Sequence, residues 1–118
     1  MAFSVVPRPR VYDARGGRCA YLIEYDRRGS VAVITIDRPE HRNAIDNDTA
    51  VALRDAWERF EDDDEALVGV LTGSGDTFSA GADLKKMDLE DRPEGWLGFS
   101  RMHVSKPTIA AVEGHCVA

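Results

Sequence analysis

The sequence predicts an α/β fold, on three observations. Residues 21–25 and 30–36 are short stretches rich in β-branched and aromatic side chains, and residues 67–72 form an unbroken apolar run. Between these stretches, apolar side chains recur at the spacing of one helix face: Ala50, Leu53, Trp57 and Phe60. An alternation of strand and helix patterns is typical of domains in which helices pack against a sheet.

The first two strands are expected to pair as a hairpin. Residues 21–25 fit one strand, residues 26–29 a turn that ends in glycine, and residues 30–36 the second strand. Pro39 has no N–H to donate, so it should end the ladder and leave residues 37–44 as a polar loop.

A helix should follow, with Asp46 or Asn47 as its N-cap and an end near residue 61. Its apolar stripe is assigned to the core and is given no ligand role. The acidic run 61–65 is expected to be solvated. Because negative charge is unfavourable at a helix C-terminus, the helix should end before most of that run.

Two more strands and another helix are expected in the second half of the chain. Residues 67–72 are typical of a strand with both faces covered, and residues 108–112 should form a second buried strand. Pro93 fits the first turn of a helix that stops before Pro107. That helix would carry three large apolar side chains: Trp96, Phe99 and Met102.

Length and composition fit one domain. The 118 residues are 43% hydrophobic and 31% charged, which is typical of a globular protein with a modest core. We assign residues 1–20 to a flexible N-terminal extension and residues 21–118 to the domain. No apolar run approaches membrane-spanning length and no signal peptide is recognisable, so we expect a cytoplasmic protein without a membrane partner.

Charge and cysteine content restrict the partners. The net charge is −6 and no basic stripe is present, which argues against nucleic acid as the main partner but leaves a small anion possible. Cys19 and Cys116 lie far apart and do not have metal-ligand spacing, so no metal site is expected. Two reduced thiols are our interpretation, and a disulfide remains compatible with the sequence.

The stretch FSAGADLKKM at residues 78–87 is the main candidate for a site. Small side chains at Ala80, Gly81 and Ala82 allow another group to approach the backbone, and residues 83–87 should begin a helix. N–H groups at a helix start lack intrahelical partners and lie at the positive end of the dipole. An anion or oxyanion site is one reading and a plain strand-to-helix connection is the other. A phosphate loop at residues 73–75 is set aside, because the Gly-Lys-Ser/Thr ending is absent.

Three motifs occur together in order: IDRPEHRNA at residues 36–44, LTG with FSAGADL at residues 71–73 and 78–84, and KPTIAAVEG at residues 106–114. They closely resemble the N-terminal half of the crotonase (enoyl-CoA hydratase/isomerase) superfamily. The resemblance covers about residues 21–118 and is specific for the superfamily, but not for one reaction within it.

The resemblance implies a spiral of ββα turns around two roughly perpendicular sheets, incomplete here at the C-terminus. It also implies trimers or pairs of trimers for the full-length protein. Members bind acyl-CoA thioesters and stabilise an enolate-like oxyanion with two backbone N–H groups. Coenzyme A enters as part of the substrate, and no separate cofactor is implied.

By the same resemblance, the Ala82 N–H is the first oxyanion donor. The substrate cleft would be lined by Arg42, Ala44, Ala80, Gly81, Ala82, Asp83 and Leu84. Lys85 and Lys86 fit either a phosphate contact or a solvated helix face. His41 is assigned to solvent, and Asp83 to a helix start and not to proton transfer.

The second oxyanion donor and the catalytic carboxylates are expected beyond Ala118, because in the family they follow the segment that resembles residues 114–118. No carboxylate in the sequence replaces them; Glu113 is interpreted as a turn residue. His115 and Cys116 cannot form a nucleophilic pair, because adjacent residues of a strand point to opposite faces.

Two kinds of function remain open from the sequence. One is an enoyl-CoA hydratase, or its fragment, that adds water to a 2-enoyl-CoA; isomerase and hydrolase reactions of the same superfamily are variants of this reading. The other is a truncated, non-catalytic binding or assembly protein that keeps the scaffold without the chemistry.

Overall fold

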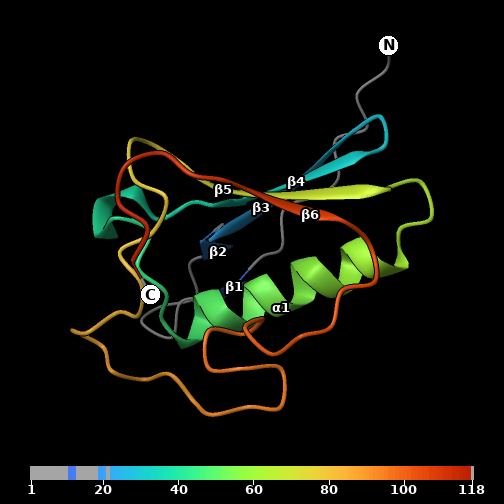
Figure 1. Cartoon of the computed structure of the whole chain (residues 1–118). Helices are drawn as coiled ribbons and strands as arrows, with labels where there is room; N and C mark the ends of the chain where they lie inside the picture. The colour runs from blue at the N-terminus through green and yellow to red at the C-terminus, as the bar shows by residue number, and fades with distance from the viewer. Residues whose placement is uncertain (1–10, 13–18, 21, 118) are drawn as a thin grey trace.

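The computed structural model describes residues 11–12, 19–20 and 22–117. Its main body is a four-stranded sheet with one long helix against one face (Figure 1). The strands of this sheet run in the order β3-β4-β5-β6, and a separate pair is formed by β1 and β2. The elements are β1 (Val11–Tyr12), β2 (Cys19–Ala20), β3 (Ile23–Arg28), β4 (Val31–Ile36), η1 (Pro39–His41), α1 (Asn47–Asp62), β5 (Val68–Gly73) and β6 (Thr108–Ala111).

The predicted hairpin is present as the antiparallel pair of β3 and β4. The predicted turn at residues 26–29 is wrong, because β3 continues to Arg28 and the chain reverses at Gly29, whose φ is 61°. The polar end of β3 is stabilised from outside the hairpin. Arg27 Nη2 lies 2.7 Å from the Glu65 carboxylate, and Arg27 Nε lies 3.6 Å from that of Asp63.

Helix α1 follows the prediction closely at its start. Asp46 is the N-cap, and its side chain accepts a hydrogen bond from the Thr49 N–H at 2.8 Å. At the other end the acidic run is not simply solvated, as the sequence suggested. The Asp63 carboxylate is half-buried against β3, where it accepts a hydrogen bond from the Tyr25 hydroxyl at 3.0 Å. Burial, and then this hydrogen bond, raise the pKa of Tyr25 to about 12.

The core lies between α1 and one face of the sheet. Strand β4 connects through α1 to β5, which pairs with it in parallel. Burial alternates along β4 and β5, so the prediction that β5 is covered on both faces is wrong. The largest fully buried apolar side chains come from β3, β4 and α1: Tyr25, Phe60, Ile23, Ile34, Ile36 and Leu53.

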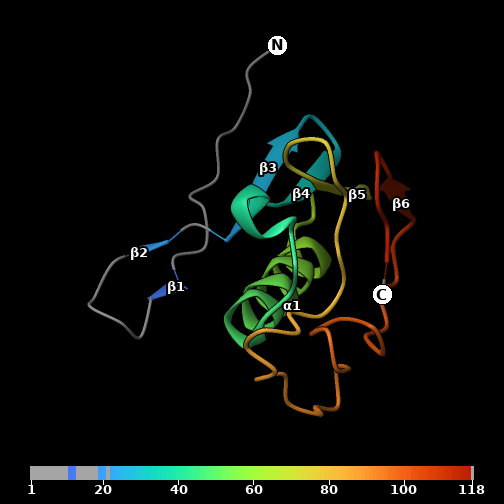
Figure 2. The same cartoon turned by 90° about the vertical axis from the view of Figure 1, so that its left-hand side faces the viewer.

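Strand β6 is not the buried strand that the sequence predicted. It pairs in parallel with β5 and forms the edge of the sheet opposite β3 (Figure 2). All four of its residues are exposed, and Ile109 is 57% exposed. The apolar core is formed by α1 with β3, β4 and β5, and β6 lies beyond it. An open groove of about 430 Å³ lies beside β6, bordered by Trp57, Phe99 and Met102.

Neither helix predicted between residues 83 and 107 forms. After Asp83 the chain makes one turn, closed by a hydrogen bond from the Met87 N–H to the Asp83 carbonyl oxygen at 3.0 Å. Met87 has a φ of 49°, which is unfavourable within a right-handed helix and ends the turn. Leu84 and Met87 are 76% and 71% exposed, so no apolar face anchors a longer helix there.

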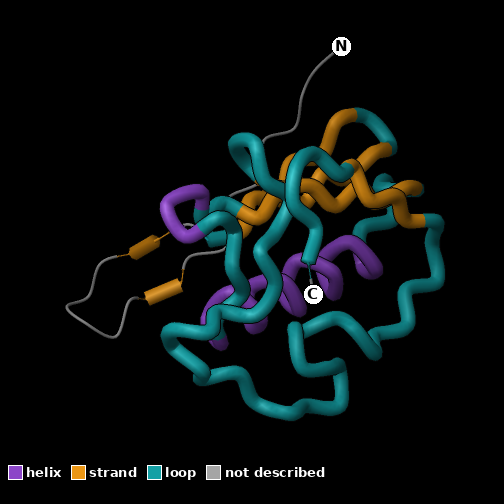
Figure 3. The backbone as a smooth tube through the Cα atoms, turned by 60° about the vertical axis from the view of Figure 1, so that its left-hand side comes forward, coloured by secondary structure: helices purple, strands orange, loops and turns teal. Residues whose placement is uncertain are grey.

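The second predicted helix is replaced by turns that run along α1 as a loop (Figure 3). Gly95 and Gly98 have φ values of 110° and 88°, which interrupt a helix. A Cβ atom at Gly98 would collide with the carbonyl group of Ala50, so the loop lies directly against the helix backbone. Phe99 and Met102 still pack against the core.

The flexible extension predicted for residues 1–20 falls mostly outside the described residues. Within it, β1 and β2 pair antiparallel, and Cys19 belongs to β2. No helix in the described part of the chain is long and apolar enough to cross a bilayer.

Lys106 fastens the C-terminal end of α1 to the start of β6. Its ammonium group donates to the carbonyl oxygens of Phe60, Asp63 and Ala66 at 2.7, 2.7 and 2.8 Å. A cation is favourable there because the last carbonyls of a helix lack intrahelical donors and carry the negative end of the dipole.

We expect Lys106→Met to lower the free energy of unfolding by roughly 2–3 kcal/mol, because three charge-assisted hydrogen bonds to carbonyl oxygens are lost. Urea denaturation measures this change. The exposed Lys85 provides the control, and Lys85→Met should change stability by less than about 0.5 kcal/mol. Equal stabilities of the two variants would contradict the role given to Lys106.

Candidate active site

Two loops meet at the end of the sheet where β4 and β5 finish. Three backbone hydrogen bonds join them: Ala80 N–H to the Arg42 carbonyl oxygen at 3.0 Å, Ile45 N–H to that of Gly81 at 2.8 Å, and Asp83 N–H to that of Ile45 at 2.9 Å. The loop after β4 thus forms one wall of the candidate site, and the FSAGADL stretch forms the other.

Asn43 holds the two loops in place from inside. It is fully buried, with a φ of 55° that an asparagine tolerates better than most residues. Its side-chain oxygen accepts from the Arg38 N–H at 2.9 Å, and its amide nitrogen donates to the carbonyl oxygens of Ser74 and Thr77 at 2.9 and 2.7 Å. Every hydrogen-bonding group of that side chain is therefore used for structure and not for a ligand.

The Ala82 N–H points away from the loop after β4. Ile45 and Ala82 form an isolated parallel bridge that uses the Gly81 carbonyl and the Asp83 N–H. In such a bridge the N–H of the central residue points away from its partner. Among the hydrogen bonds between described residues, none uses the Ala82 N–H. Gly81, with a φ of 86°, makes the sharp turn that presents it.

A surface hollow of about 500 Å³ lies over this junction. It is lined by Glu40, His41, Arg42, Ala44, Ala80, Ala82, Asp83, Leu84 and Lys85. Six of the seven residues expected in the cleft from the sequence lie together here, and Gly81, between Ala80 and Ala82 in the chain, is buried and does not line the hollow. Three small side chains leave the hollow open: Ala44, Ala80 and Ala82.

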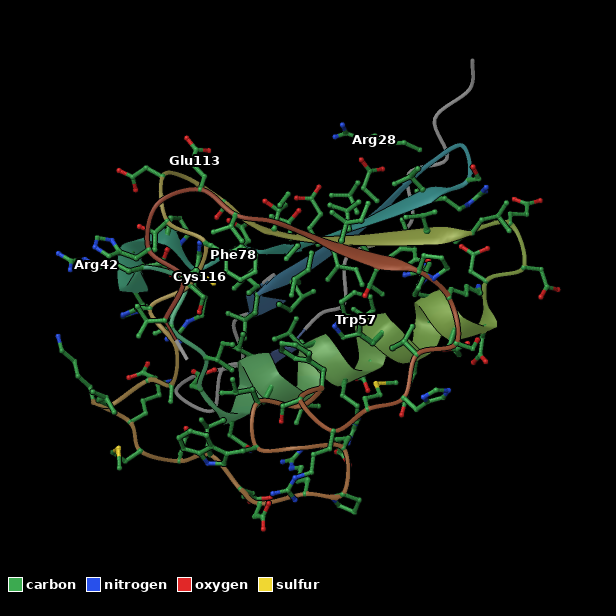
Figure 4. All side chains as sticks on the ribbon, viewed as in Figure 1. Arg28, Arg42, Trp57, Phe78, Glu113 and Cys116 are labelled. Carbon is green, nitrogen blue, oxygen red and sulfur yellow. The ribbon has the colours of Figure 1, made fainter. Side chains whose placement is uncertain are left out.

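The cations near the hollow have different roles. Arg42 and Lys85 are exposed and line it, and the Arg42 side chain extends outward from the end of η1 (Figure 4). Lys86 instead contacts the Asp46 carboxylate at 2.7 Å, so it supports the loop. His41 is exposed, as expected, but it also lines the hollow.

A cluster of four charges, three of them buried, lies behind the site. Arg38 donates through both Nη atoms to Asp83 Oδ2 at 3.3 Å, and its Nη2 lies 3.5 Å from Asp46 Oδ2. Lys86 completes the cluster, which carries two positive and two negative charges. Asp83 Oδ1 accepts from the N–H groups of Lys85 and Lys86 at 3.0 and 3.2 Å, so this carboxylate has a structural role.

Hydrogen bonding keeps both buried carboxyl groups ionised. Burial alone raises the pKa of Asp46, but hydrogen bonds from Lys86 and Thr49 outweigh it and lower that pKa. The pKa of Asp83 is lowered in the same way, as burial is outweighed by the N–H groups of Lys86 and Lys85 and by Arg38. Neither carboxyl group is therefore suited to hold a proton near neutral pH.

The sequence did not reveal the residues that position the two loops. Arg38 and Asn43 look like ordinary polar loop residues, and their partners lie as far as 45 positions away in the chain. The one available signal is that both belong to the IDRPEHRNA motif, in which only Arg42 and Ala44 were considered as site residues.

The last described residues run beside the FSAGADL stretch. The Ser79 N–H donates to the His115 carbonyl oxygen, and the Val117 N–H donates to that of Ser79, each at 3.0 Å. Cys116 forms an isolated bridge with Ser79 in place of a strand, and its free thiol is exposed.

The second oxyanion donor and the catalytic carboxylates are expected beyond Ala118, outside the residues that line the hollow. Ala118 itself lies outside the described residues, the last of which is Val117. Glu113, the carboxylate nearest to this end of the sequence, extends away from the junction into solvent (Figure 4). Within the described chain, Ala82 is therefore the one expected oxyanion donor at the hollow, and the position of the second donor stays a prediction.

The family model for enoyl-CoA hydratase/isomerase matches residues 26–118. The chain belongs to this family, and its sheet and helix form part of the crotonase fold. Among solved structures, a carnitinyl-CoA dehydratase from Mycobacterium avium 104 is similar at a TM-score of 0.72 and 48% identity, covering 79% of this chain and 38% of that one. Enoyl-CoA hydratase EchA1 from Mycobacterium marinum is similar at a TM-score of 0.74 and 38% identity, covering 79% and 38%.

Two curated relatives are also named as enzymes that act on CoA thioesters. The chain is 38% identical over 95 residues to mevalonyl-coenzyme A hydratase sidH of Aspergillus fumigatus, covering 74% of this chain and 35% of that protein. It is 41% identical over 97 residues to carnitinyl-CoA dehydratase of Salmonella paratyphi B, covering 75% and 37%. The chain thus spans a little over a third of the length of these relatives.

The buried carboxylates should make the fold sensitive to acid. Their pKa values are lowered in the folded state, whereas an unfolded aspartate titrates near about 3.9. Their contribution to stability is therefore complete above about pH 4 and is lost as the pH falls through the lower folded values. Urea unfolding between about pH 6 and pH 2.5 should show this loss, and it should be shallower in Asp83→Asn. A stability that does not change over this range would contradict the role of the cluster.

Proposed function

We propose that this chain binds an acyl-CoA thioester and donates the Ala82 N–H to the thioester oxygen, as one half of the oxyanion hole of an enoyl-CoA hydratase. The observation that carries the proposal is the N–H of Ala82, which donates to no described residue and is held by the bridge to Ile45 at the edge of an open hollow. A backbone donor fixed in advance stabilises developing negative charge without reorganising during the reaction.

The hollow supplies the remaining contacts for the coenzyme A part of the substrate. The small side chains of Ala44 and Ala80 leave room for the narrow pantetheine arm, and Arg42 and Lys85 offer positive charge to phosphate groups. Asp83 and Leu84 complete the wall beside Ala82. The overall charge of −6 does not oppose this, because cations at the hollow act locally.

The register of the last described residues supports a second donor beside the first. Cys116 lies parallel to Ser79, so a chain that continued past Ala118 in this direction would approach Ala82. In the family, a glycine after this segment supplies the second N–H, and carboxylates further along move the protons. We propose the same division for the protein that contains this chain, together with the trimeric assembly that the family resemblance implies.

The names of the relatives favour hydration over the other reactions of the superfamily. They are a mevalonyl-coenzyme A hydratase, carnitinyl-CoA dehydratases and enoyl-CoA hydratases, and these names describe addition or removal of water on CoA thioesters. We therefore propose syn addition of water to a 2-enoyl-CoA. An assay with crotonyl-CoA of the full-length protein that contains this chain, monitored by the loss of enoyl thioester absorbance, tests the reaction itself, and no turnover would contradict it.

Binding of the coenzyme is tested by Arg42→Ala. We expect its dissociation constant for butyryl-CoA, measured by calorimetry, to rise about tenfold, since losing one charged phosphate contact costs roughly 1.5 kcal/mol. Arg28→Ala is the matched control, because Arg28 is exposed at the far end of β3 (Figure 4). Equal affinities of the two variants would contradict the placing of the coenzyme in this hollow.

A further inference from the structure

We propose that Arg38 is the positioning residue of the oxyanion donor. It fixes the Ala82 N–H by contacting both segments that form the Ile45–Ala82 bridge, an arrangement that we call the clamp. This inference rests on the proposed function, because it assigns a residue that supports the same donor. Arg38 is not among the residues that line the hollow, so its action passes through Asp83 and Ala44.

The bridge needs outside support because it is short. Its two hydrogen bonds, at 2.8 and 2.9 Å, are isolated from the main sheet, and residues 79–83 form no strand of their own. The turn after Asp83 ends at Met87, so no helix anchors that side either. The other contacts that join the loops, the Ala80–Arg42 hydrogen bond and the Asn43 amide, lie earlier in the loop and do not reach Ala82 or Asp83. Without further support, the donor would be free to shift with the segment that carries it.

Arg38 reaches the bridge from both sides. Its Nη1 donates to the Ala44 carbonyl oxygen at 2.5 Å, and both Nη atoms donate to Asp83 Oδ2 at 3.3 Å. Nη2 also lies 3.5 Å from Asp46 Oδ2. One guanidinium therefore contacts the residues immediately before and after Ile45 and the residue immediately after Ala82.

An arginine is required for this arrangement. Its planar group presents several N–H donors in fixed directions, whereas a lysine ammonium is a single point on a flexible stem. The Arg38 side chain is 4% exposed, and its two acidic partners are 3% and 9% exposed. Within the described chain, this guanidinium is the contact that neutralises Asp83 from the interior, while Lys86 serves Asp46 from the surface.

Amide hydrogen exchange tests the clamp without any ligand. In Arg38→Lys we expect the Ile45 and Asp83 amides to exchange at least tenfold faster, while the Ile34 and Leu53 amides of the core change less than threefold. Arg54→Lys, in an ion pair with Asp55 on α1, is the matched control and should leave all four amides unchanged. Unchanged exchange at Ile45 and Asp83, or equal acceleration at all four amides, would overturn the proposal.

A second variant covers the case in which Arg38→Lys does not fold. Asp83→Asn keeps the oxygen that accepts from the Lys85 and Lys86 N–H groups but removes the charge that faces Arg38. It should accelerate the same two amides, and the same failure to do so would overturn the proposal.

Infrared spectroscopy of bound butyryl-CoA, labelled with carbon-13 at the thioester carbonyl, separates this inference from the proposed function. A carbonyl band moved to lower frequency in the wild-type complex supports the donor. Arg38→Lys should lose at least half of that displacement, while the dissociation constant changes less than threefold. An unmoved wild-type band would refute the oxyanion function and leave the exchange result to decide on the clamp. A moved band that is identical in Arg38→Lys would overturn the clamp alone.

Discussion

The isolated bridge between Ile45 and Ala82 is the contact on which the rest of the site depends. It brings the loop after β4 against the loop after β5, and the Ala82 N–H points away from Ile45. Together with the Ala80–Arg42 hydrogen bond and the Asn43 amide, it holds the residues around the hollow next to one another. The chemistry proposed for Ala82 needs only a backbone donor, so the side chains around it are free to serve position and access.

The charged side chains at this junction form two groups, one buried and paired and the other exposed at the hollow. Arg38, Asp46 and Asp83 are buried and, together with Lys86, balance one another. Such pairs add little net stability, because desolvation offsets most of their attraction, but breaking one leaves a charge buried without its partner. Their value here is a fixed geometry. Arg42 and Lys85 remain at the surface, where a ligand can use them.

The sequence predicted well the elements whose periodicity is long and uninterrupted. The stripe of α1 with its Asp46 cap and the alternation of β4 were readable because they depend on local patterns. The helix expected around Phe99 failed because Gly95 and Gly98 adopt positive φ against α1, which no periodicity reveals. The prediction that β6 is buried was wrong, because the sequence of an apolar strand does not show whether another element covers it.

The sequence likewise predicted some residues of the candidate site and not others. The small residues of the FSAGADL stretch and the resemblance of three motifs were enough to bring Ala82, Arg42 and Ala44 into one expected cleft, and the structure places them around one hollow. Arg38 and Asn43 could not be assigned, because a buried polar side chain is defined by partners that only the folded chain brings near.

The most direct test of the central claim is the amide proton of Ala82. Its chemical shift can be followed by nitrogen-15 NMR while butyryl-CoA, which cannot be hydrated, is added to the purified protein. If the Ala82 N–H donates to the thioester oxygen, its proton resonance moves downfield by more than any other amide between residues 79 and 87. If butyryl-CoA binds and the Ala82 resonance stays in place, Ala82 is not the oxyanion donor.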